Sequence, residues 1–299
     1  MAKSKQFKIL SFGEILWDML PEGKKLGGAP ANFAYHCSAL GHKVRLVSKV
    51  GADELGSEIL AAYRSLGLKT TFIGFDSIHP TGTVDVGIAE DGSPSYTINE
   101  DTAWDFLMIL PSLQTWTSKC DVVCFGSLAM RSKYNRETLP QLLDSLPKQT
   151  LRVLDLNLRE PYCQDEIIEF VLPLADILKL NEEEMLRLTQ LLDIKKKTVK
   201  HQLAALQEKF GYKLIILTCG SEGSHLAAGE DYCFTPGRKV KIKDTVGAGD
   251  AFTAAAVTNF LSGKSLKENG ESANRLASYV CTKSGGTPVI PPSILADIQ

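Results

Sequence analysis

Asp244-Thr245-Val246-Gly247-Ala248-Gly249-Asp250-Ala251-Phe252 is the stretch of the chain that decides the fold. Two glycines form a turn between two acidic residues, and the alanine-rich run over 251–261 predicts a buried helix directly after it. The first N–H groups of a helix lack partners and carry partial positive charge, so an anion can lie against residues 247–250. Asp250 would repel a phosphate but suits the deprotonation of a hydroxyl that attacks one. We interpret this turn as a candidate catalytic centre.

The same residues allow a simpler interpretation, in which Asp250 is a helix N-cap and the glycines only shape a connection. The motif G-x-G-x-x-G fails, because Phe252 stands three places after Gly249, and no G-x-x-x-x-G-K-[ST] occurs in the chain. A dinucleotide-binding dehydrogenase is therefore a weak alternative.

The composition is that of an ordinary globular protein that can bury a large core, with 299 residues, 44% hydrophobic and 23% charged. A net charge of -2 argues against a nucleic-acid surface. The seven cysteines include no C-x-x-C pair and the five histidines no H-E-x-x-H pattern, so we expect reduced thiols and no catalytic zinc. Without a signal core or a membrane span, we expect a cytoplasmic protein with a small-molecule partner.

Hydrophobic periodicity predicts alternating strands and helices. The predicted strands are 7–13, 15–20, 44–50, 70–75, 121–125, 151–157, 175–180 and 213–218; the predicted helices are 30–40, 53–66, 132–145, 164–172, 182–192, 198–210 and a last one over 278–286. This order indicates an α/β fold with a mainly parallel sheet and helices on both faces. Residues 22–25 and 91–94 are expected to form turns, and 82–90 with 95–99 an antiparallel hairpin that interrupts the alternation.

Two motifs carry a resemblance to a known family. The stretch 244–252 resembles the C-terminal motif of the PfkB (ribokinase-like) carbohydrate kinases, and Gly27-Gly28-Ala29-Pro30-Ala31-Asn32-Phe33-Ala34 is similar to their sugar-binding motif in the form typical of fructokinases. Because the motifs lie at opposite ends, the resemblance spans nearly the whole chain. It implies a single ribokinase-like domain over 1–299, with a small β lid formed by about 14–26 and 81–99.

The resemblance also implies roles for particular residues. Asp250 would be the catalytic base, and the amides of Gly247, Ala248 and Gly249 an anion hole. Sugar contacts fall on Asp18, Gly27, Gly28, Asn32 and Arg159, and nucleotide contacts on Thr218, Gly220, Gly223 and Asn274. Asn181 and Glu184 would support Mg²⁺ through water, and Asp244 with Gly286 would hold a monovalent cation such as K⁺.

Each of these positions also has an ordinary structural interpretation. Asp18 can be a solvated strand residue, Asn32 a helix-capping residue, and Asn181 and Thr218 loop residues. Arg159 suits an anionic oxygen through its fixed fork of donors, but the sequence leaves open whether it meets sugar or phosphate.

We therefore expect an ATP-dependent kinase that phosphorylates the primary hydroxyl of a sugar, fructose to fructose 6-phosphate, with a homodimer formed through the lid. The alternatives are a ketodeoxygluconate, ribose or nucleoside kinase of the same family and, from another class, a catalytically silent sugar-binding regulator. Residues 82–99 contain no Lys or Arg and three acids (Asp85, Glu90 and Asp91), which favours a neutral sugar.

Overall fold

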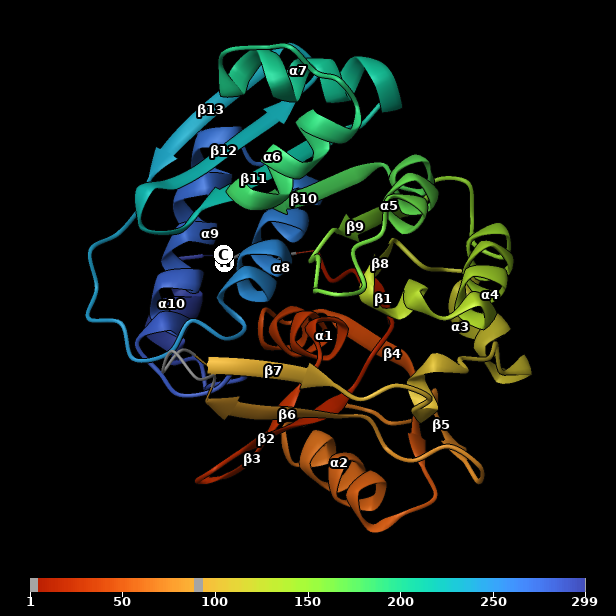
Figure 1. Ribbon diagram of the computed structural model, residues 1–299. Helices are drawn as coiled ribbons and strands as arrows, with labels where there is room; N and C mark the ends of the chain where they lie inside the picture. The colour runs from red at the N-terminus through yellow and green to blue at the C-terminus, as the bar shows by residue number, and fades with distance from the viewer. Residues whose placement is uncertain (1–4, 89–93, 299) are drawn as a thin grey trace.

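The computed structural model describes residues 5–88 and 94–298, and within them nine strands form one central sheet (Figure 1). These strands are β1 (Lys8–Phe12), β4 (Lys43–Gly51), β5 (Ile73–Asp76), β8 (Val122–Gly126), β9 (Leu151–Asp155), β10 (Ile177–Asn181), β11 (Leu214–Cys219), β12 (Gly223–Ala228) and β13 (Asp231–Pro236). Their order is β13-β12-β11-β10-β9-β8-β1-β4-β5. The strands from β5 to β11 are parallel, so their carboxyl ends meet along one edge.

Helices cover both faces of this sheet, as the sequence predicts. On one face lie α1 (Ala29–Ala39), α8 (Ala248–Leu261) and α9 (Leu266–Cys281); on the other lie α4 (Lys133–Asp144), α5 (Asp165–Val171), α6 (Glu182–Leu191) and α7 (Val199–Phe210). Side chains alternate along a strand, so Ile9 packs into the core beneath α1 and α8 while Leu10 packs into the opposite core. Helix α2 (Glu54–Ser65) belongs to a third cluster with α1 and β4.

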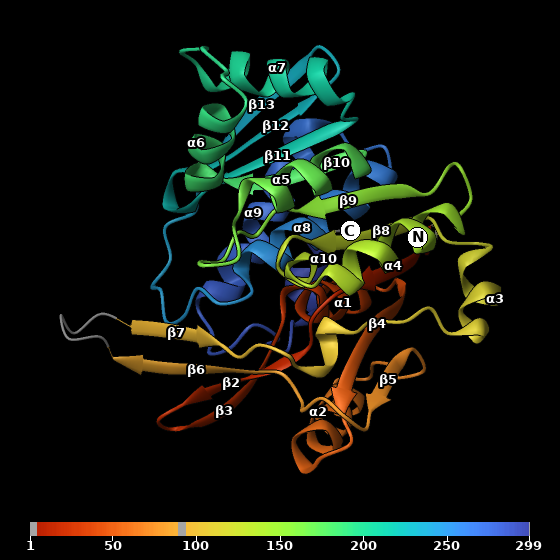
Figure 2. The ribbon, with the colours of Figure 1, turned by 45° about the vertical axis from the view of Figure 1, so that its right-hand side comes forward.

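A second, four-stranded sheet contains β2 (Leu16–Leu20), β3 (Gly23–Gly27), β6 (Thr83–Ile88) and β7 (Pro94–Ile98), in the order β3-β2-β6-β7. Figure 2 shows it projecting from one side of the main body. The predicted hairpin and its pairing with β2 are confirmed. Of the predicted turn over 91–94, residues 91–93 lie outside the described residues, as do the acids Glu90 and Asp91.

Two predictions about secondary structure are wrong, and two strands were not predicted. Residues 23–25 belong to β3, because Gly23 at φ 128 lets the chain reverse directly after Pro21 and Glu22. The last long helix is α9, which begins after the Ser265–Glu268 capping box and ends at Cys281, so 282–286 form a loop rather than a helix. The antiparallel edge strands β12 and β13 have no counterpart among the predicted elements.

Short elements complete the described chain: α3 (Gln114–Thr117), α10 (Pro292–Ala296) and the 3-10 turns η1 (Ala103–Asp105), η2 (Pro111–Leu113), η3 (Leu128–Arg131), η4 (Leu172–Leu174) and η5 (Gly220–Glu222). Within the residues described, none of the helices combines the length and apolar character that crossing a bilayer requires.

Candidate active site

The amino end of α8 lies at the carboxyl edge of the parallel strands and begins earlier than predicted, at Ala248. Gly247 caps it with φ 75, and a Cβ there would lie 2.5 Å from Gly286 Cα, so only glycine fits this turn. The Ala248 amide donates to Thr245 O at 3.2 Å. The amides of Gly249 and Asp250 remain the first-turn donors available to an anion.

Asp250 receives a 2.9 Å hydrogen bond at Oδ2 from Asn32 Nδ2. The pKa of Asp250 is raised to about 7, first by burial and then by the negative charge of Asp155, although Asn32, Lys179 and Arg159 act in the opposite direction. A carboxyl group with this pKa changes protonation state at neutral pH, which suits a general base. The structure thus brings together two residues that the sequence assigned to separate motifs.

Beneath the anion-binding turn lies a buried ion pair that the sequence analysis did not single out. Lys179 Nζ is 2.9 Å from Asp155 Oδ1, and Thr253 Oγ1 donates to Asp155 Oδ2 at 3.2 Å. A Cβ on Gly249 would lie 3.3 Å from Lys179 Nζ, so the ammonium group lies directly under the turn. The sequence feature that could have revealed this ion pair is the single lysine within the apolar run of β10, because a lysine is rarely buried unless it is paired.

Asp18 lies on β2 of the small sheet, close to the glycine pair that precedes α1. Burial raises the pKa of Asp18 to about 6, helped by the charge of Asp244, while Lys25 and Arg159 lower it. A Cβ on Gly27 would lie 2.5 Å from Asp18 Oδ2, so a side chain there would displace the carboxylate. The sequence-predicted sugar residue is therefore within electrostatic reach of the C-terminal motif.

Asp244 holds the loop 282–286 against the turn that precedes α8. Its Oδ1 accepts from Val246 N at 3.0 Å, its Oδ2 accepts from Gly285 N at 2.8 Å, and Lys25 Nζ of β3 lies 3.8 Å away. Lys25 also bonds Ser284 Oγ at 3.0 Å, so the small sheet contacts this loop.

Gly286 is fixed from the other side by His36. Burial lowers the pKa of His36 to about 4, so the ring is neutral and its Nε2–H donates to Gly286 O at 2.8 Å. The predicted monovalent cation site at Asp244 and Gly286 therefore consists of two loops held in a fixed relation by side chains. Its occupation by K⁺ stays a prediction.

Asn181 and Glu184 form a reciprocal cap at the start of α6. Asn181 Oδ1 accepts from Glu184 N at 2.9 Å, and Glu184 Oε2 accepts from Asn181 N at 2.8 Å. Glu184 Oε1 accepts from Leu158 N at 2.9 Å. Over residues 5–88 and 94–298, no group of three or more His, Cys, Asp or Glu side chains is arranged to hold a metal ion. This donor set fits Mg²⁺ that is bound mainly by phosphates and water, with Asn181 and Glu184 near it.

The predicted nucleotide residues lie around the connection from β11 to β12. Gly220 and Gly223 have φ of 48 and 124, so they shape this connection, and Thr218 Oγ1 donates to Leu180 O at 3.4 Å. Asn274 Nδ2 donates to Thr235 O at 3.2 Å, which ties α9 to β13. These contacts are structural, and the nucleotide contacts stay predictions.

Arg159 follows β9 on an exposed loop, where its Nη1 donates to Leu158 O at 3.0 Å. Its charge lowers the pKa of Glu14, Asp18 and Asp250. Arg159 is therefore a cation within electrostatic reach of these three acidic groups.

Comparison with known proteins agrees with this arrangement. The model of the pfkB family carbohydrate kinases matches residues 21–292. A Pyrococcus horikoshii protein described as an uncharacterized sugar kinase is 32% identical to this chain, and the match covers 93% of this chain and 91% of that protein. The structure of that protein in complex with ATP has a TM-score of 0.80, and the match covers 97% of this chain and all of that one. The Escherichia coli fructokinase is 28% identical over 95% of this chain and 96% of its own length.

A Vibrio cholerae fructokinase structure, in a form with fructose, ADP and potassium ion bound, has a TM-score of 0.80 at 22% identity and covers 99% of this chain and all of that one. At that identity the likeness concerns the fold, and the ribokinase-like α/β fold is confirmed. The family model spans nearly the whole chain, both of its characteristic motifs meet at one site, and the chain belongs to the pfkB family of carbohydrate kinases.

Proposed function

We propose that this chain is an ATP-dependent sugar kinase that phosphorylates the primary hydroxyl of fructose to give fructose 6-phosphate. The observation that supports the proposal is the 2.9 Å bond from Asn32 to Asp250, which joins a carboxyl group whose pKa is raised to about 7 to the motif over 27–34. Relatives with the printed name fructokinase, such as the Escherichia coli protein at 28% identity, support the choice of sugar.

In the proposed reaction Asp250 accepts the proton of the attacking sugar hydroxyl. The amides of Gly249 and Asp250, with the Lys179 ammonium group beneath them, stabilise the negative charge of the transferred phosphoryl group. When bound, Mg²⁺ neutralises phosphate charge. Asp18 and Asn32 orient the sugar by accepting hydrogen bonds from its hydroxyl groups.

We further propose that the chain is one ribokinase-like domain in which the small sheet, formed by about 14–26 and 81–99, acts as a lid. Lys25 supports this, because it bonds Ser284 and lies 3.8 Å from Asp244 next to the anion-binding turn. Closure over the sugar would exclude water from the phosphoryl group. A homodimer formed through the exposed face of the lid is a further part of the proposal, tested by sedimentation of the purified protein.

The second candidate is an acidic sugar such as ketodeoxygluconate. Arg159 favours it, because none of the described ion pairs includes its guanidinium group and its charge lowers the pKa of Asp18 and Asp250. Against it stand the acidic side chains around the site, which would repel a carboxylate.

A coupled ADP-release assay across fructose, ketodeoxygluconate, ribose and nucleosides tests the proposal. We expect the highest kcat/KM for fructose. If another acceptor gives the highest value, the choice of fructose is wrong and the kinase activity stands. Sugar binding without phosphoryl transfer from ATP to any acceptor would indicate a silent regulator instead.

A further inference from the structure

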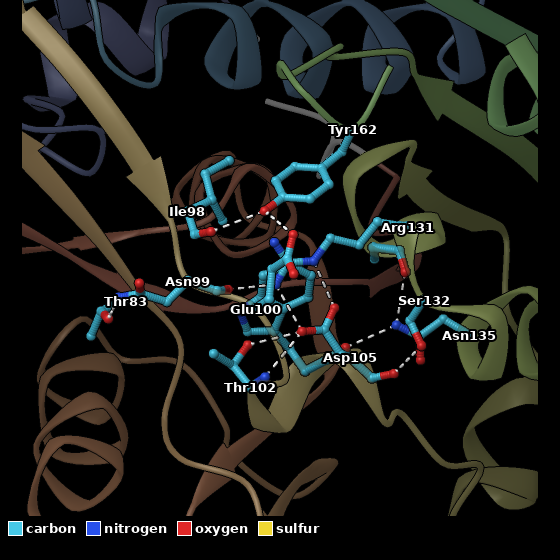
Figure 3. Close-up of polar contacts among 12 residues, drawn as sticks. Thr83, Ile98, Asn99, Glu100, Thr102, Asp105, Arg131, Ser132, Asn135 and Tyr162 are labelled. Atoms are coloured by element: carbon cyan, nitrogen blue, oxygen red, sulfur yellow. Dashed lines mark hydrogen bonds and ion pairs between the residues drawn. The ribbon is translucent and has the colours of Figure 1, made fainter. Parts of the chain in front are cut away.

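Arg131, in η3, is held by hydrogen bonds to Asp105 of η1 and to Asn99, which follows β7 (Figure 3). Its Nε and Nη2 donate to the two carboxylate oxygens of Asp105 at 2.8 and 2.7 Å, and Nη2 also donates to Asn99 O at 2.6 Å. The guanidinium carbon lies 4.0 Å from the ring centroid of Trp104 and 4.6 Å from that of Tyr162. The group is thus clamped between two aromatic rings and fixed by a carboxylate.

Further hydrogen bonds fix Tyr162 and Asp105, which hold Arg131. Tyr162 Oη bonds Ile98 O at 3.1 Å and Glu100 Oε1 at 2.8 Å, and Asp105 Oδ2 also accepts from Thr102 N at 3.1 Å. A buried donor that is left without a partner costs free energy. Arg131 Nη1 is buried and has no partner in the part of the chain that the structure describes.

Glu14 provides a matching unpaired acceptor. It follows β1, and its Oε1 accepts from Ala29 N at 3.2 Å, while its Oε2 is buried without a partner among the described residues. The segments are adjacent, because a Cβ on Gly13 would lie 3.7 Å from Ala129 Cβ, two residues before Arg131. The pKa of Glu14 is raised to about 7, mainly by burial, against smaller lowering effects that include the charges of Arg159 and Arg131.

Unpaired buried polar atoms are costly, and an unpaired donor and an unpaired acceptor on adjacent segments indicate a ligand group that serves both. We propose that Arg131 Nη1 and Glu14 Oε2 form a second sugar subsite, which binds one uncharged hydroxyl group away from the point of phosphoryl transfer. The hydroxyl accepts from Arg131 and donates to Glu14. A carboxylate cannot donate, and Asp105 already neutralises Arg131, so the subsite selects a neutral polyol. This inference rests on the kinase function proposed above.

The test combines side-chain variants with deoxy sugars. Kinetics are measured for the preferred sugar and each of its monodeoxy analogues with the wild type, Arg131→Lys, Glu14→Gln and the control Arg136→Lys. Arg136→Lys makes the same chemical change nearby, in α4, where Arg136 Nη1 bonds the carbonyls of Met130 and Arg131 at 2.7 and 3.3 Å and Nη2 lies 3.7 Å from Glu166 Oε1.

For the wild type we expect one analogue to lose about 10- to 100-fold in kcat/KM, because both side chains are then left unpaired. With the full sugar, Arg131→Lys and Glu14→Gln should each lower kcat/KM by a similar factor, mainly through a higher KM. With that deoxy analogue, each variant should have nearly the same kcat/KM as the wild type has. Arg136→Lys should show the same ratio of kcat/KM between the full sugar and the deoxy analogue as the wild type.

If both site variants lower kcat/KM by the same factor on the full sugar and all analogues, Arg131 and Glu14 only support the fold and the subsite is wrong. Should Arg131→Lys fail to fold, Glu14→Gln decides alone. If no sugar is phosphorylated, the proposed function fails, and the subsite is then judged by thermal shift. A sugar-induced rise in Tm that Glu14→Gln abolishes supports it, and no rise with any sugar overturns it.

Discussion

Asn32 at the start of α1 donates a 2.9 Å hydrogen bond to Asp250 at the start of α8, across 218 residues of sequence. Gly286 lies beside the same amide, since a Cβ there would be 2.8 Å from Asn32 Nδ2. The amino ends of two helices and the loop after a third therefore converge on one carboxylate.

Asp250→Asn keeps the size of the side chain but removes the base. We expect kcat to fall by roughly 10²- to 10⁴-fold, while sugar and ATP binding survive. Initial rates and calorimetric binding measure the two effects. The control Asp165→Asn changes an exposed acid paired with Arg187 and should leave kcat unchanged. Near-normal turnover in Asp250→Asn would mean that Asp250 is only a helix cap.

The pKa of Asp250, raised to about 7 by burial, sets the pH dependence of activity. The base must be deprotonated, so kcat/KM of the wild type should rise with pH through a midpoint near 7. Rates between pH 5 and 9 in a constant-ionic-strength buffer measure it. A profile that is flat from pH 5 to 9 would contradict the assignment.

The same shift predicts a stability effect. A carboxyl group whose folded-state pKa lies above its unfolded value stabilises the fold below the unfolded pKa of about 3.9 and loses this contribution as pH rises through about 7. Asp250→Asn should therefore gain stability relative to the wild type between pH 5 and pH 8, measured by urea unfolding. Glu14 also has a pKa of about 7 but is common to both proteins, so the difference isolates Asp250.

Gly247→Ala tests the close approach of the anion-binding turn to Gly286. Gly247 has φ 75 and would place a Cβ 2.5 Å from Gly286 Cα, whereas Gly263 has the same φ and no heavy atom within 4 Å of an added Cβ. Gly263→Ala should cost only about 1–2 kcal/mol of stability for the left-handed backbone. Gly247→Ala should in addition lower kcat by roughly 10²-fold, because the donors move. Equal kcat in the two variants would contradict this reasoning.

Lys179→Met leaves Asp155 buried without its counterion. We expect a loss of about 3–5 kcal/mol in the free energy of unfolding, measured with urea. Lys213→Met is the matched control, because its 2.9 Å pair with Asp176 is on the surface and should be worth less than about 1 kcal/mol. A loss no larger than that of the control would show that Asp155 is not buried as a charged group.

Hydrogen exchange tests the lid. Amides of β2 and β3, over 16–27, and of β6 and β7, over 83–88 and 94–98, should exchange more slowly when the sugar is bound. Amides of β9 in the central sheet serve as the internal reference. Unchanged protection in the small sheet, with sugar binding confirmed independently, would remove the lid from the mechanism.

The sequence alone determined most of the secondary structure and the family. Alternating apolar runs predict the parallel strands and their helices, because burial on both faces imposes a local pattern on each segment. Gly28 and Gly247 are also visible in the sequence, since each has the positive φ that its own turn requires.

Only the tertiary structure decided which residues meet. The pairing of Lys179 with Asp155 follows from β9 and β10 being neighbours in the sheet, which no local pattern specifies. The meeting of Asn32 with Asp250, and of Arg131 with the segment of Glu14, likewise depends on strand order and helix packing. Buried polar groups are satisfied by partners distant in sequence, so their chemistry becomes visible only once the chain has folded.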